Sequence, residues 1–172
     1  MTPNAQANKP VVIQGGMGIG VSSWHLANAV ASCGQLGVVS GTALEIVVTR
    51  RLQDGDPGGD VRAALAALPL PDVADRVLAR WFRPQGREND EPYAPVPRPG
   101  IRSSRACDEL SLASNFVEVW LAKRGHDGPV GINYLEKIQM GTPACAYGAM
   151  LAEVDYVIMG AGVPREIPRL IT

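Results

Sequence analysis

The chain has 172 residues, enough for one domain, and its 46% hydrophobic content is that of a globular protein rather than a disordered one. A formal net charge of −1 gives no electrostatic reason to expect a nucleic acid or an anionic membrane as partner. No apolar run reaches the roughly 18 residues of a membrane span. The polar start, "MTPNAQANKP", does not resemble a signal peptide, so we expect a cytoplasmic protein.

The first predicted strand is 11–14, "VVIQ", a β-branched run that we expect to be covered on both faces. Four glycines follow within six positions. Ser22 or Ser23 can then cap a helix over 24–33, which Gly34 would end.

A second short strand is predicted over 36–41, and a helix follows over 42–53. From about 58 to 125 the pattern changes to two amphipathic segments, an exposed proline-rich loop and a longer helix over 106–124. We interpret 52–125 as a helical and loop insertion within a single domain that spans 1–172.

The last predicted elements are a strand over 129–134, a helix over 144–154 and a strand over 155–160. Buried strands that alternate with helices indicate a parallel sheet built from βαβ units. The sequence therefore predicts an α/β fold.

Small or polar residues end each predicted strand. In α/β folds ligands collect at the carboxyl ends of the strands, where glycine allows close approach to the backbone. The candidate contacts are Gly15, Gly16, Met17, Gly18, Ser40, Gly41, Asn133, Met159 and Gly160.

A dinucleotide is one ligand that this pattern could hold. The fingerprint G-x-G-x-x-G has Gly16 and Gly18 in register, but Val21 stands at the third glycine position. The acid expected at the end of the second strand is missing, since Glu45 lies too far along the chain.

A flavin is the second ligand. Glycines and Met17 would form a wall beside the isoalloxazine ring, and the amide of Asn133 can both donate to and accept from the ring's heteroatoms. The alternative that needs no ligand is that each glycine cluster is only a tight turn between a strand and a helix.

Three blocks of the chain, "VVIQGGMGIGVSSWHLANAVASCGQLGVVSGTALE", "GPVGINYLEKIQ" and "VDYVIMGAGVPREIP", resemble the nitronate monooxygenase family, formerly called 2-nitropropane dioxygenases. That family includes FMN-dependent enoyl-ACP reductases. The resemblance covers about 1–50 and 127–168. It implies an FMN-binding TIM-type (β/α)8 barrel, in which Gly15 to Gly18 line the flavin, Asn133 hydrogen-bonds it, and Ser40, Gly41, Met159 and Gly160 surround the same mouth.

A complete barrel needs about 250 residues, so the resemblance implies that the chain holds only about the first four βα units. The family's catalytic histidine and phosphate site would lie beyond the chain end, which leaves the catalytic residue unknown. We expect His25 and His126 to have no catalytic role. An incomplete barrel leaves uncovered edges, so we expect a homo-oligomer or a need for the missing C-terminal half.

The implied activity is oxidation of a nitronate-like small carbon acid with FMN, with oxygen or a nicotinamide as redox partner. An FMN-dependent enoyl-thioester reductase and a catalytically silent, truncated fragment or interaction subunit are the alternatives. No metal is expected, because Cys33, Cys107 and Cys145 are too widely spaced for a zinc site or a disulfide framework.

Overall fold

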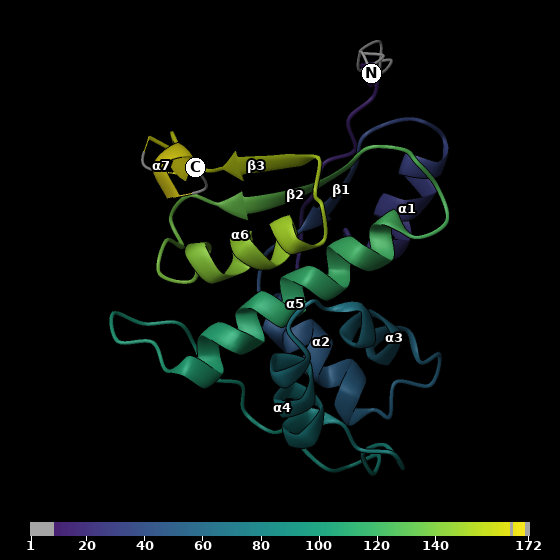
Figure 1. Ribbon diagram of the computed structural model, residues 1–172, viewed down its shortest axis with the longest axis vertical. Helices are drawn as coiled ribbons and strands as arrows, with labels where there is room; N and C mark the ends of the chain where they lie inside the picture. The colour runs from purple at the N-terminus through teal and green to yellow at the C-terminus, as the bar shows by residue number, and fades with distance from the viewer. Residues whose placement is uncertain (1–8, 166, 171–172) are drawn as a thin grey trace.

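The computed structural model describes residues 9–165 and 167–170 (Figure 1). In that part of the chain a small parallel sheet is combined with helices. The elements in chain order are α1 (Trp24–Ser32), β1 (Gly37–Ser40), α2 (Leu44–Gln53), α3 (Asp60–Ala67), α4 (Pro71–Trp81), α5 (Arg105–Lys123), β2 (Val130–Leu135), α6 (Thr142–Leu151), β3 (Tyr156–Gly160) and α7 (Ile167–Leu170).

The sheet has the strand order β1-β2-β3, and all its pairs are parallel. Ser40 pairs with Asn133, and Asn133 pairs in turn with Ile158. Because parallel strands end at the same edge of a sheet, this register brings the carboxyl ends of all three strands together.

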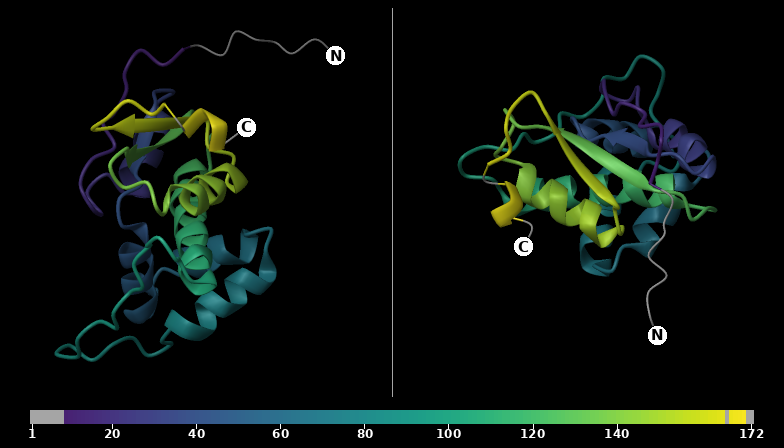
Figure 2. Two further views of the ribbon diagram at one scale, coloured as in Figure 1. Left: turned by 90° about the vertical axis from the view of Figure 1, so that its left-hand side faces the viewer. Right: turned by 90° about the horizontal axis from the view of Figure 1, so that it is seen from above.

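Helices α1, α5 and α6 lie on one face of the sheet (Figure 2). Alternate strand residues point into this layer, among them Val39, Ile132 and Tyr134, which belong to the buried core. The opposite face carries Asn133 and Ile158 and is covered by no helix in the part of the chain that the structure describes. The sheet therefore has one face covered by helices and one face without helices, here called the open face, which is covered only in part, where Gly16 lies against Val38 of β1.

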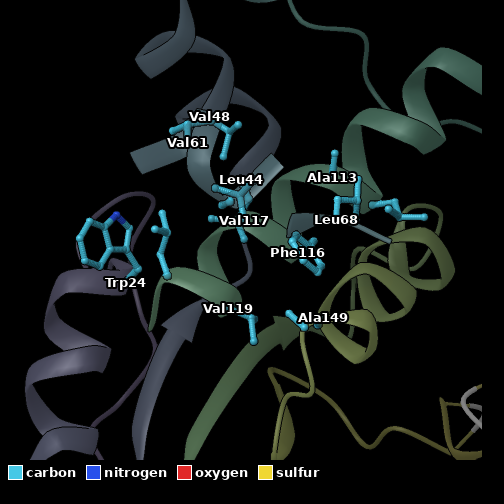
Figure 3. Close-up of a cluster of buried hydrophobic side chains, with 14 of the residues drawn as sticks. Trp24, Leu44, Val48, Val61, Leu68, Ala113, Phe116, Val117, Val119 and Ala149 are labelled. Atoms are coloured by element: carbon cyan, nitrogen blue, oxygen red, sulfur yellow. The ribbon is translucent and has the colours of Figure 1, made fainter. Parts of the chain in front are cut away.

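Helix α5 is the centre of the core. Its N-cap is Ser104, whose hydroxyl accepts a hydrogen bond from the Cys107 amide at 3.3 Å. Nearly all side chains from Cys107 to Ala122 are buried, as expected for a helix with packing partners on every side. Figure 3 shows Phe116 and Val117 of this helix among side chains from α1, α2, α3 and α6.

The predicted incomplete barrel of four βα units is wrong. The sheet has three strands in the described residues, which are too few for such a barrel start. The segment 11–14 forms only an isolated bridge, between Ile13 and Leu36. The amides of Val11 and Val12 donate instead to the side-chain oxygen of Gln35, at 3.0 and 2.7 Å.

The reason lies in what surrounds this segment. Its β-branched residues suit a strand that is covered on both faces, but Val11, Val12 and Ile13 are 90%, 57% and 62% exposed. The run gains little from packing, and the Gln35 side chain takes the amides of Val11 and Val12, so its pairing with the neighbouring segment stops at a single bridge.

Within 52–125, α3 and α4 pack against α5 and contribute Val61, Leu65 and Val77 to the core. The carboxylate of Asp56 accepts hydrogen bonds from the amides of Val61 and Arg62 and so starts α3. That 52–125 is an insertion stays a prediction.

Candidate functional site at the strand ends

Asn133 connects the strand ends to the glycine loop. Its side-chain nitrogen donates to the carbonyl oxygen of Gly16 at 2.8 Å, and its backbone carbonyl accepts from the amide of Gly41 at 2.8 Å. Ser40 pairs with it on β1. A Cβ atom built on Gly160 would lie 3.6 Å from Asn133 Oδ1. Residues from four separate stretches of the chain therefore meet around one amide.

The oxygen of that amide is unusual because Asn133 Oδ1 is buried and has no hydrogen-bond partner. Buried polar atoms are nearly always paired, since leaving one unpaired costs free energy. The neighbouring Gly160 has no side chain, and a Cβ there would make only ordinary contacts. This arrangement leaves an unpaired acceptor beside a residue without a side chain, and an N–H or O–H group is the partner that this oxygen lacks.

The glycines themselves have different explanations. A Cβ on Gly16 would lie 2.5 Å from Val38 Cγ1, and a Cβ on Gly41 would lie 2.4 Å from the ring of Tyr134. Both are thus required by close packing inside the protein. Gly18 has a φ of +77°, which favours glycine without any ligand. Gly15 and Gly160 are the two predicted contacts at which neither a close approach nor a positive φ requires glycine.

The two methionines predicted to lie at the site differ in position. Met17 is 72% exposed on the glycine loop. Met159 pairs with Tyr134 and packs against the core, so its side chain points to the helical face. Only the backbone of Met159 can therefore take part on the open face. The hydroxyl-bearing Ser40 is buried and shares the face of Asn133.

Two residues of the site were missed by sequence reasoning. Gln14 and Ser22 hydrogen-bond the backbone of the glycine loop. Ser22 was expected as a possible cap of the first helix, but the N-cap is Ser23, which makes no side-chain capping bond. No local pattern predicts that the hydroxyl of Ser22 turns back to the loop instead.

The start of α1 is closed to anions. The carboxylate of Glu118, a residue that is 1% exposed, accepts the Trp24 amide at 3.1 Å and pairs with Arg51. In a dinucleotide site the pyrophosphate would need this helix start. A buried carboxylate already there repels a phosphate, so the geometry disfavours the dinucleotide alternative.

A polar cluster lies inside the helical layer, below the same strand ends. The hydroxyl of Ser111 donates to Glu45 at 2.7 Å, the thiol of Cys145 donates to Glu45 at 3.8 Å, and the hydroxyl of Tyr134 donates to Asn115 at 2.9 Å. Burial is the main cause that raises the pKa of Tyr134 well above its usual value. Burial, followed by the charge of Glu45, raises the pKa of Cys145 to about 12. The thiol is therefore protonated near neutral pH and is not a nucleophile.

The rings of both histidines contact other residues of the protein. The ring of His25 stacks on Trp24, with 3.5 Å between the ring centroids. The ring nitrogens of His126 hydrogen-bond the carbonyl of Ala122 and the amide of Gly128. Between residues 9 and 165 and over 167–170, no group of three or more His, Cys, Asp and Glu side chains is placed to hold a metal ion.

Two clefts, of about 550 and 260 Å³, lie away from the strand ends. The larger is lined by Trp120 and Phe116, the smaller by Trp24 and Asp56, and neither is lined by a predicted cofactor contact. Asp56 already holds the start of α3, so it is not free to bind a ligand there.

Over the described residues, no helix is both long and apolar enough to cross a bilayer. Comparison with known proteins finds no matching family model, no similar curated protein and no similar solved structure.

Proposed function

We propose that this protein binds FMN at the open face of the strand ends and is an oxidoreductase of nitronate monooxygenase type. The observation that carries the proposal is the buried, unpaired oxygen of Asn133 beside the bare backbone of Gly160. The imide of an isoalloxazine ring offers an N–H donor of the kind this oxygen lacks.

The residues present fit such a group. Asn133 would accept its N–H, Gly15 and Gly160 would present backbone without side chains to a flat ring, and the exposed Met17 would cover it. When bound, FMN would accept electrons from a nitronate-like small carbon acid and pass them to oxygen. The protein's own part is to bind the cofactor, orient it and exclude water from one face.

A second candidate is a flavin-holding protein without turnover of its own. It is favoured by the positions of the two histidines: His25 stacks on Trp24 and His126 hydrogen-bonds Ala122, which leaves no imidazole at the strand ends. The same proposal includes a cytoplasmic location, supported by three free cysteine thiols.

FMN titration of the purified chain tests the cofactor proposal. Quenching of FMN fluorescence should saturate with the wild type, and Asn133→Ala should weaken the affinity about 10-fold through loss of the hydrogen bond. Asn28→Ala is the matched control, because Asn28 bonds the carbonyls of Ala122 and Arg124 away from the site. It should leave the affinity unchanged.

A folded wild-type chain that does not quench FMN would refute the cofactor proposal. If FMN binds, oxygen consumption with a small nitronate separates the two candidates: turnover supports the monooxygenase, and binding without turnover supports the flavin-holding protein.

A further inference from the structure

Apart from Gly16, which packs onto β1, the glycine loop, residues 15–21, is held mainly by hydrogen bonds. Met17 and Val21 are each 72% exposed and Ile19 is 56% exposed, so their side chains bury little apolar surface. Gly18 and Gly20 have φ values of +77° and +69° and add conformational freedom. A loop with so few apolar contacts opens easily unless polar contacts fix it.

Ser22 supplies the central contacts. Its hydroxyl donates to the carbonyl of Gly15 at 2.9 Å and accepts from the amide of Met17 at 3.0 Å. Its amide donates to the carbonyl of Met17 at 3.2 Å, and its own carbonyl accepts from the amide of Ser40 at 2.9 Å. Ser22 is only 5% exposed, so water cannot readily replace these bonds.

Gln14 closes the other side of the loop. Its side-chain nitrogen donates to Gly15 at 2.5 Å and to the hydroxyl of Ser22 at 3.2 Å, while its oxygen accepts from the amide of Val38 at 2.9 Å. The backbone on both sides of Gly16 is therefore connected to β1 through the side chain of Gln14 and through Ser22, whose backbone carbonyl bonds Ser40.

The position of Gly16 determines which way the amide of Asn133 points. Its carbonyl accepts the side-chain nitrogen of Asn133, which leaves the unpaired oxygen on the side of Gly160. If Gly16 moved, the amide could rotate and present its nitrogen instead. An acceptor would then be exchanged for a donor at the same place.

We propose that Ser22 is a positioning residue: its hydroxyl fixes the loop so that Gly16 holds the Asn133 amide with the oxygen toward the ligand. The effect of Ser22 on ligand binding rests on the proposed function, since the Asn133 oxygen is the group that would accept the flavin N–H. The effect of Ser22 on the Asn133 amide concerns only this chain and can be measured without a cofactor.

The experiment compares Ser22→Ala, Ser22→Thr and the neighbouring control Ser23→Ala, whose hydroxyl makes no capping bond. Hydrogen exchange of the Asn133 side-chain amide is followed by NMR in the free chain, with Asn133→Ala to assign the signal. FMN affinity is measured by fluorescence quenching, and circular dichroism checks folding. If Ser22→Ala does not fold, Ser22→Cys, which is only slightly larger than serine and weakens the hydrogen bonds, takes its place.

Ser22→Ala should speed exchange of the Asn133 amide at least 10-fold and weaken FMN binding about 5-fold, a loss typical of one hydrogen bond. Ser22→Thr and Ser23→Ala should stay within twofold of the wild type in both measurements. Unchanged exchange in Ser22→Ala, or faster exchange with unchanged FMN affinity, would overturn the inference. If the wild type binds no FMN, the proposed function fails, and amide exchange alone decides the role of Ser22.

Discussion

Gly15 and Gly16 are adjacent, yet packing requires only one of them to be glycine. A Cβ on Gly16 would lie 2.5 Å from Val38 Cγ1 and 2.8 Å from the carbonyl oxygen of Val39, whereas a Cβ on Gly15 would come no closer than 4.0 Å to another residue's atom. The glycine-rich sequence therefore combines a residue that packs onto β1 with one that faces open space.

We expect Gly16→Ala to lower the free energy of unfolding by roughly 2 kcal/mol, because the backbone carbonyl of Val39 cannot move aside. Gly15→Ala should change it by less than about 0.5 kcal/mol. Urea unfolding of the two variants beside the wild type measures both. Equal losses in the two variants would contradict this account of the loop.

Asn133 illustrates what sequence reasoning can find at the residue scale. A strand that ends in an amide pointed to a ligand at its carboxyl end, and the structure brings Gly16, Ser40 and Gly160 around that residue. The side chain of Met159 points to the opposite face from Asn133 because side chains alternate along a strand. This direction could be predicted only once the pairing of Met159 with Tyr134 was known.

At the scale of elements, Glu118 of α5 joins three helices. Its carboxylate accepts from the first amide of α1 and pairs with Arg51 of α2. The carboxylate is almost fully buried, whereas Arg51 keeps partial contact with solvent. Such a group holds the helices in register as well as capping one of them.

Removing this carboxylate should be costly. We expect Glu118→Ala to lower the free energy of unfolding by about 2–3 kcal/mol, because the Trp24 amide and the Arg51 guanidinium lose their partner. Glu118→Gln should recover part of the loss, since its oxygen can still accept from Trp24. Chemical denaturation followed by circular dichroism measures both.

The control is Glu91→Ala, which removes the exposed ion pair with Arg83 and should leave the denaturation midpoint unchanged. A loss in Glu118→Ala no larger than in this control would show that the three-helix contact does not stabilise the fold.

Helix positions could be predicted well from the sequence. The spacing of apolar residues predicts helices over 24–33 and 106–124, and the structure has them at Trp24–Ser32 and Arg105–Lys123. The segment 11–14 shows the limit of this reasoning, because β-branched residues indicate a preference for strands but not the presence of neighbours. The Glu118 contact could not be predicted either, since it joins residues 94 positions apart and no local pattern marks it.

At the scale of the whole molecule, the sheet is covered unevenly. Helices bury one face, and apolar side chains are exposed in the segment 11–21 and in the loop after β3, among them Ile13, Val21 and Val163. Large exposed apolar patches on a protein often mark a surface that binds something. The expectation of a homo-oligomer stays a prediction that gel filtration can test.

A dye that binds exposed apolar surface probes this face directly. We expect the native chain to increase the fluorescence of anilinonaphthalene sulfonate, and Val21→Lys/Val163→Lys to reduce that increase at least twofold. Ile101→Lys is the control, because Ile101 is an isolated exposed side chain, 96% accessible, in a loop. An equal reduction in control and double variant would show that the dye does not report on the open face.

The capping of α1 by Glu118 also bears on the order of events during synthesis. A ribosome releases the N-terminal end first, so the first amide of α1 emerges 94 residues before the carboxylate that completes it. At 5–20 residues per second this interval is roughly 5–20 s. The glycine loop and Ser22 lead directly into that helix. The contact between Trp24 and Glu118 cannot form in the nascent chain until α5 has left the exit tunnel.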